Sequence, residues 1–135
     1  MSYNQGDIVL VPFPFTIGTS WPAIVVSNST VDNTEDVILA QITYKPRKDV
    51  FTYSLENEKL SKSLNLSSQV RCHKIFIVQK TTIYKKISTL NQIGISELRE
   101  KIISFFETSI MASRYTVGLL LWMLHSAYKN NKINR

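Results

Sequence analysis

The hydrophobic pattern of this chain changes once, near residue 90, and this change restricts the fold more than any other feature. Before it, short runs of aliphatic residues such as Asp7 to Val11, Pro22 to Ser27 and Val37 to Thr43 are separated by polar stretches. Runs of this length and composition are typical of strands. After it, four apolar residues recur at steps of three and four: Ile95, Leu98, Ile102 and Phe105. That spacing predicts one amphipathic helix.

The middle of the chain predicts further, shorter strands. We expect them at about Asp49 to Ser54, Gln69 to Cys72, Ile75 to Ile77 and Thr81 to Ile87. The polar residues 28–36 predict a connection, and residues 56–68 predict a loop with a short helical turn. Ser96 is expected to cap the helix. Many short strands followed by one helix predict a mainly β fold with α, a small and partly open barrel with the helix against it.

A chain of 135 residues is expected to form one barrel domain, residues 1–107, with an extension at residues 108–135. Apolar residues of the extension recur at helical steps: Ile110, Val117, Leu121, Leu124 and Tyr128. The extension is therefore predicted to be a basic helix that packs on the barrel or on a second subunit. The alternative is a helix that binds a membrane surface or a partner.

The net charge of +6 is unevenly distributed. Residues 108–135 hold four basic and no acidic residues, which leaves +2 for residues 1–107, and residues 1–44 hold four acids and no Lys or Arg. A basic protein favours a polyanionic partner, which can be a nucleic acid, an acidic protein or an anionic membrane face.

The single cysteine, Cys72, excludes an internal disulfide and is interpreted as a small core residue. Adjacent residues of a strand point to opposite faces, so Cys72 and His73 are not expected to pair as nucleophile and base. The N-terminus lacks a signal-peptide pattern and no apolar run is long enough to span a bilayer, so we expect a cytoplasmic protein. Neither metal-ligand spacing nor a glycine-rich nucleotide motif is present, and no metal or cofactor is expected.

Cations and hydroxyl groups gather near two predicted strand ends. They are Thr43, Tyr44, Lys45, Arg47 and Lys48, and then Gln69, Arg71 and Lys74. Such groups can hold phosphates and stabilise the extra charge of a pentacoordinate phosphorus. Tyr44 and Trp21 can stack on unpaired bases. The alternative interpretation is a solvated, charged loop.

Four segments resemble MazF/PemK-type toxins, the mRNA interferases of type II toxin–antitoxin systems. They are Gln5 to Thr16, Pro22 to Ser27, Val37 to Thr43 and Ser68 to Phe76. The resemblance implies an SH3-like barrel with a C-terminal helix, which works as a homodimer with a cognate acidic antitoxin. It also implies metal-independent, sequence-specific cleavage of single-stranded RNA, with a cyclic phosphate as one product, which inhibits translation and growth.

Two residues of the resembling segments match the family's functional positions. Thr43 corresponds to the family's Thr, which serves the phosphate step, and Arg71 to the Arg of its Val-Arg segment. The family's catalytic Arg is replaced by Trp21, and the family's loop before it is shorter here and has no basic residue. The catalytic candidates are therefore Thr43 and Arg71, which match family positions, and Arg47, a cation that could substitute for the missing Arg. The candidates for RNA binding are Trp21, Tyr44, Lys45, Lys48, Gln69 and Lys74.

Three hypotheses follow. The leading one is a MazF/PemK-like endoribonuclease in which Arg47, Lys45 or Arg71 substitutes for the missing Arg. The second, based on Trp21, is a family member that binds RNA or antitoxin without cleavage. The third is a CcdB-like poison of a DNA topoisomerase, for which the sequence holds no positive feature.

Overall fold

The computed structural model describes residues 2–12, 18–108 and 121–130. The chain divides into two compact units, Met1–Ile102 and Ile103–Arg135. The boundary expected after residue 107 stays a prediction.

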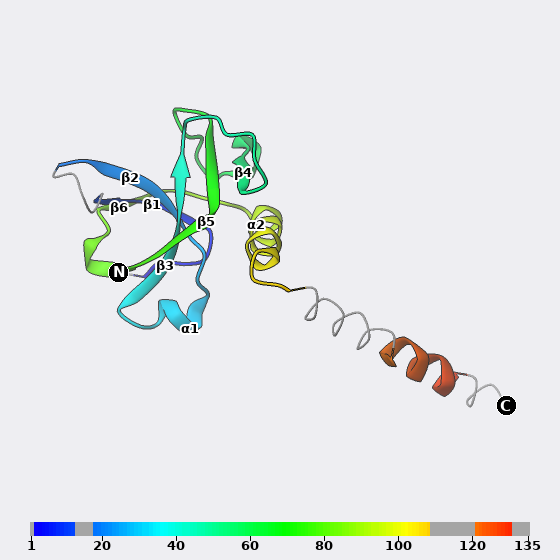
Figure 1. The fold of residues 1–135 in the computed structure, drawn as a ribbon. Coiled ribbons are helices and arrows are strands. Elements are labelled where there is room, and N and C mark those ends of the chain that lie inside the picture. Colours follow the sequence, from blue (N-terminus) through cyan, green and yellow to red (C-terminus); the bar gives the residue numbers. More distant parts are fainter. Residues whose placement is uncertain (1, 13–17, 109–120, 131–135) are drawn as a thin grey trace. The chain divides into compact units, whose positions relative to one another are not determined.

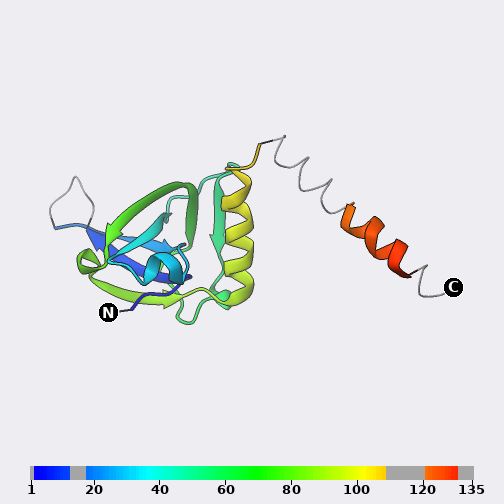
Figure 2. The same ribbon diagram turned by 90° about the horizontal axis from the view of Figure 1, so that it is seen from below.

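Among the described residues of the first unit, six strands form one antiparallel sheet that curls into a half-barrel (Figures 1 and 2). Its strands are β1 (Asp7–Pro12), β2 (Ser20–Val25), β3 (Asp36–Thr43), β4 (Thr52–Leu55), β5 (Ser68–Gln79) and β6 (Lys85–Thr89), in the spatial order β4-β5-β3-β2-β1-β6. The helices are α1 (Ser29–Asp32) and α2 (Gln92–Ser104), with 3-10 turns η1 (Asn57–Lys59) and η2 (Lys80–Thr82). The prediction of a mainly β fold with a C-terminal helix is confirmed.

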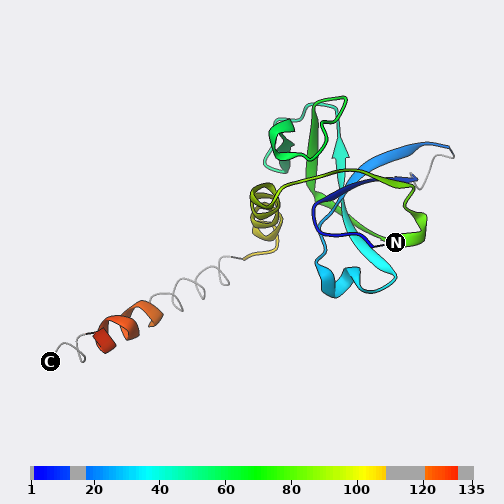
Figure 3. The same ribbon diagram turned by 180° about the vertical axis from the view of Figure 1, so that it is seen from behind.

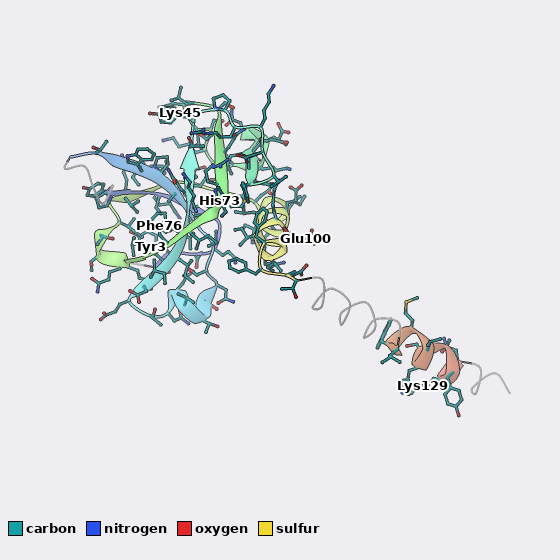
Figure 4. The ribbon with its side chains drawn as sticks, viewed as in Figure 1. Tyr3, Lys45, His73, Phe76, Glu100 and Lys129 are labelled. Carbon is teal, nitrogen blue, oxygen red and sulfur yellow. The ribbon has the colours of Figure 1, made fainter. Side chains whose placement is uncertain are left out.

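The core lies inside the curl and follows from the alternation of the strands. Its buried residues are Tyr3, Val9, Val11, Ala23, Val25, Val37, Leu39 and Ile83, with Phe76 and Val78 packed against them. Figure 4 shows Tyr3 and Phe76 on this inner side. Each buried Val or Leu stabilises the fold by about 1.5–3 kcal/mol relative to an exposed one.

The two strands predicted at 69–72 and 75–77 are one strand, β5, of 12 residues. Its register against β3 shifts, because Ala40 lies opposite Ile75 whereas Gln41 lies opposite Arg71. Residues 72–74 therefore have no direct partner on β3. The sequence pattern predicts two strands because the polar His73 and Lys74 interrupt the apolar run. A bulge accommodates these polar residues within one strand.

Helix α2 begins earlier than the apolar spacing predicts. The Asn91 Oδ1 accepts a hydrogen bond from the Gly94 N–H at 2.9 Å, and the Asn91 carbonyl accepts one from the Ile95 N–H. Ser96 is an exposed residue inside the helix, so the prediction that it forms the cap is wrong. The helix lies beside β4 (Figure 2), and the Lys101 Nζ donates to the Thr52 carbonyl at 2.7 Å.

The remaining boundaries differ in detail. Residues 81–87, predicted as one strand, form the end of η2 and the start of β6. The short strand expected at 49–54 begins only at Thr52, and the predicted connection 28–36 contains the one-turn α1. The helical turn expected within 56–68 is confirmed as η1.

In the second unit, residues 121–130 are helical, as predicted for this part of the extension (orange-red in Figure 3). The predicted stripe residues Leu121, Leu124 and Tyr128 are exposed there. Ile110, Arg114 and Val117 lie outside the described residues. No helix in the described part of the chain has the length and apolar character needed to cross a membrane.

Candidate functional site

A pocket of about 430 Å³ collects most of the predicted site residues. It is lined by Trp21, Gln41, Thr43, Tyr44, Lys45, Arg47, Arg71 and Lys74. Seven of these eight were singled out from the sequence, and Gln41 was not. Lys48 and Gln69 are outside the lining. Figure 4 shows Lys45 at the end of the sheet where β3 stops.

The register of three strands explains why these residues meet. Gln41 of β3 lies opposite Ala23 of β2 and opposite Arg71 of β5. Because side chains two residues apart on a strand share a face, Thr43 joins Gln41 on this face, and Trp21 joins Ala23. The intervening Ile42 is 1% exposed and lies on the opposite face of the sheet, whereas Gln41 and Thr43 continue the face of the core residues Val37 and Leu39.

Arg71 is held by an ion pair. Its Nη1 donates to both carboxylate oxygens of Asp49, each at 3.0 Å, and only 8% of the residue is exposed. Desolvation by itself raises the pKa of Asp49, but hydrogen bonds from the Phe51 N–H and from Arg71, together with the charge of Arg71, hold this pKa below its usual value. Arg71 thus forms a structural ion pair and also lines the pocket.

The loop that follows β3 is held to the sheet by hydrogen bonds to side chains of β3 and β5. The Arg47 N–H donates to the Gln69 Oε1 at 3.0 Å, and the Gln69 Nε2 donates back to the Arg47 carbonyl at 3.5 Å. The Thr43 Oγ1 accepts from the Lys45 N–H at 3.2 Å. Because the Thr43 oxygen is the acceptor in this hydrogen bond, its O–H can donate to a ligand oxygen. Gln69 positions this loop, and its contact with RNA stays a prediction.

Cys72 and His73 have different environments, because Cys72 is buried and His73 is exposed. Cys72 is fully buried, and burial raises the pKa of its thiol to about 11. His73 is exposed and its ring stacks on Phe51 with 4.1 Å between the centroids. Desolvation, followed by the positive charges of Arg71 and Lys74, lowers the pKa of His73. Neither residue lines the pocket.

A second pocket of about 570 Å³ adjoins the first, with Tyr44 lining both. Its lining includes Lys62 and Lys85, two cations that the sequence pattern did not single out. Lys86 lines it too, but its Nζ lies 3.9 Å from an oxygen of the buried Asp7. Among the described residues, no three His, Cys, Asp or Glu side chains are grouped where they could hold a metal ion.

Comparisons with known proteins agree with this arrangement of strands. The family model described as "PemK-like, MazF-like toxin of type II toxin-antitoxin system" matches residues 4–106. No curated protein sequence matches the chain.

The solved structures that share this fold include the following three. A MazE–MazF complex from Deinococcus radiodurans is 18% identical with a TM-score of 0.67, over 81% of this chain and 100% of that one. Mycobacterium tuberculosis toxin MazF-mt6 is 19% identical with a TM-score of 0.61, over 74% and 95%. A mycobacterial endoribonuclease in complex with its cognate antitoxin is 14% identical with a TM-score of 0.64, over 76% and 93%.

Proposed function

The chain belongs to the PemK-like, MazF-like toxin family of type II toxin–antitoxin systems, and from this premise we propose that it is a metal-independent endoribonuclease acting on a short sequence of single-stranded RNA. The observation that carries the proposal is the pocket in which Lys45, Arg47, Arg71 and Lys74 surround Thr43. Four cations around a hydroxyl suit the phosphate between two nucleotides. A protein of this activity would act on cytoplasmic mRNA and inhibit translation and growth.

In the reaction, the ribose 2′-oxygen forms a bond to the adjacent phosphorus while the bond from phosphorus to the 5′-oxygen breaks. The 2′-hydroxyl loses its proton, the leaving 5′-oxygen gains one, and the products are a cyclic phosphate and a free 5′-hydroxyl. The Thr43 hydroxyl donates to a non-bridging oxygen, and Arg47 and Arg71 stabilise the added negative charge. No histidine or carboxylate is among the residues that line the pocket, so we assign these side chains to charge stabilisation.

The remaining pocket residues would bind the RNA on either side of this phosphate. Trp21 and Tyr44 offer aromatic faces on which bases can stack, each interaction stabilising binding by about 1–3 kcal/mol. Lys45 and Lys74 would contact neighbouring phosphates. Lys48, which is exposed just outside the pocket, and Gln69, which holds the loop, stay assigned to RNA binding as predictions.

The decisive experiment incubates the purified protein with a long single-stranded RNA and a chelator. Defined cleavage products that carry a cyclic phosphate support the proposal. Thr43→Val, which keeps the shape but removes the hydroxyl, should lower the cleavage rate by about 100-fold. Absence of products at high protein concentration would contradict the catalytic claim.

A second candidate function is favoured by Trp21, which stands in the pocket where the family resemblance implies an Arg. In this version the protein binds RNA or antitoxin without cutting. Trp21→Arg separates the two, because restoring the cation to a degenerate site should raise cleavage by about 100- to 1,000-fold. An unchanged rate would mean that other residues, such as Arg47 and Arg71, already do this work. No observation favours a topoisomerase as target.

We also propose a homodimer and an acidic antitoxin as partners. The Deinococcus radiodurans and mycobacterial structures include complexes with an antitoxin, and a pocket lined by four cations suits an acidic segment. Light scattering of the full chain should give the mass of a dimer. A small acidic protein encoded next to this gene should compete with RNA for the pocket.

A further inference from the structure

Gln41 carries an inference about which base the pocket selects. It is half-buried in the middle of β3, lines the pocket, and was not among the residues that the sequence singled out. Its place opposite Arg71 and two residues before Thr43 puts it next to the candidate catalytic groups.

The other polar side chains on this face of the sheet already have protein partners. Arg71 is paired with Asp49, Gln69 with the backbone of Arg47, and the Thr43 Oγ1 accepts from the Lys45 N–H. Within the described residues, the side-chain amide of Gln41 has no such partner. An amide has one carbonyl acceptor and one NH₂ donor side by side, so it can form two hydrogen bonds with the edge of a base.

The cations of the pocket differ from Gln41 in the base edges with which they can form hydrogen bonds. Lys45, Lys74 and Arg47 only donate, so they suit phosphates or a base edge made of acceptors, such as the O6 and N7 of guanine. An amide needs a base edge with a donor next to an acceptor. Adenine presents that pair on both its Watson–Crick edge (N6–H and N1) and its Hoogsteen edge (N6–H and N7), whereas guanine, cytosine and uracil present it only on the Watson–Crick edge of these two.

We therefore propose that Gln41 is the specificity-determining residue of the pocket and that it selects an adenine next to the cleaved phosphate. The base would stack on Trp21 or Tyr44 while the Gln41 carbonyl accepts from N6–H and its NH₂ group donates to N1 or N7. The inference rests on the proposed function, because it assumes that single-stranded RNA occupies the pocket.

The experiment uses the full chain and an RNA pool with a randomised window of eight nucleotides. RNA retained by the protein and RNA cleaved by it are sequenced separately, so base preference is measured even if cleavage is slow. The wild-type protein should prefer adenine at one position by roughly 5- to 150-fold, the discrimination typical of a two-bond amide–base contact. Replacing that adenine by purine riboside, which lacks the N6 amino group, should weaken binding to a similar extent.

Two variants test the amide itself. Gln41→Met keeps the volume but removes the amide, and it should abolish the preference at that position. Gln41→Glu replaces the donor by an acceptor, and it should shift the preference toward guanine, whose N1–H and N2–H are two adjacent donors. Gln79→Met is the matched control, because it makes the same change at the far end of β5, opposite Asp36 and outside both pockets. It should keep the adenine preference.

The outcomes separate this inference from the function on which it rests. An adenine preference that survives Gln41→Met would overturn the inference and leave the nuclease intact. A guanine preference that disappears in Arg47→Ala would also overturn the inference, because the base would then be recognised by a cation. A wild-type protein without any base preference would overturn it as well. A folded wild-type protein that neither retains nor cuts RNA would instead contradict the proposed function.

Discussion

At the scale of single residues, the ion pair between Asp49 and Arg71 determines how a nearly buried guanidinium is presented to the pocket. The carboxylate fixes Nη1 and compensates part of the charge that would otherwise attract phosphate. Asp49 therefore stabilises the loop and also weakens the attraction of Arg71 for phosphate.

This pair makes stability depend on pH. The pKa of Asp49 in the folded protein lies below its usual value of about 3.9. Its contribution is therefore present above pH 4 and is lost as the pH falls through the lowered pKa. Asp49→Asn should melt at a lower temperature than the wild type at pH 7, and the gap should close toward pH 2.5. Glu35→Gln removes an exposed acid and should show no such gap; a constant gap for Asp49→Asn would contradict the assignment.

Cys72 should be chemically inert in the native protein. Its side chain is buried and its thiol pKa is raised to about 11, so at pH 8 almost no thiolate is present. We expect labelling by a disulfide reagent at pH 8 to be at least about 100-fold slower in native than in urea-unfolded protein. Rapid labelling under native conditions would place the thiol at the surface.

At the scale of elements, the N-terminus of α2 depends on Asn91. Loss of a capping side chain typically costs about 0.5–2 kcal/mol, so Asn91→Ala should lower the free energy of unfolding by that amount in urea denaturation. Ser96→Ala is the control, because Ser96 is exposed inside the helix, and it should stay within about 0.5 kcal/mol of the wild type. Equal losses in both variants would argue against Asn91 as the cap.

The helices and strands also show how much of the fold and of the site could be predicted from the sequence. The strand runs and the helical spacing predict the order of the elements, and the cations after Thr43 and around Arg71 do meet, because the end of β3 pairs with the start of β5. Gln41 was missed because an amide inside a strand carries no signal until the register shows which face it occupies. Asp49 had a signal that went unused, since it is the only acid in the basic stretch 45–50.

At the scale of the whole molecule, the net charge and the site are largely separate. The pocket belongs to the unit Met1–Ile102, whereas four of the chain's cations and no acid lie in residues 108–135. Binding to RNA should thus have a sequence-dependent part from the pocket and a sequence-independent part from the extension.

Deleting residues 108–135 tests this separation. The shortened chain should keep the wild-type cleavage pattern, while its affinity for RNAs of unrelated sequence should fall by one common factor. Its binding should also depend less steeply on salt, by about 0.7 in the logarithmic slope for each phosphate that the extension no longer binds. Filter binding at several salt concentrations measures both. A changed cleavage pattern would show that the extension takes part in recognition, and a changed mass in light scattering would assign it to subunit assembly.

The shift of register between β3 and β5 has a consequence for how this protein can diversify. Residues 72–74 absorb the offset between the paired segments on either side of them. A substitution near the pocket, beyond the shift along β3, can be accommodated within these three residues. It does not have to disturb Val37 or Leu39, which lie before the shift. The side chains of the pocket can accordingly change while the packing of Val37 and Leu39 in the core is kept.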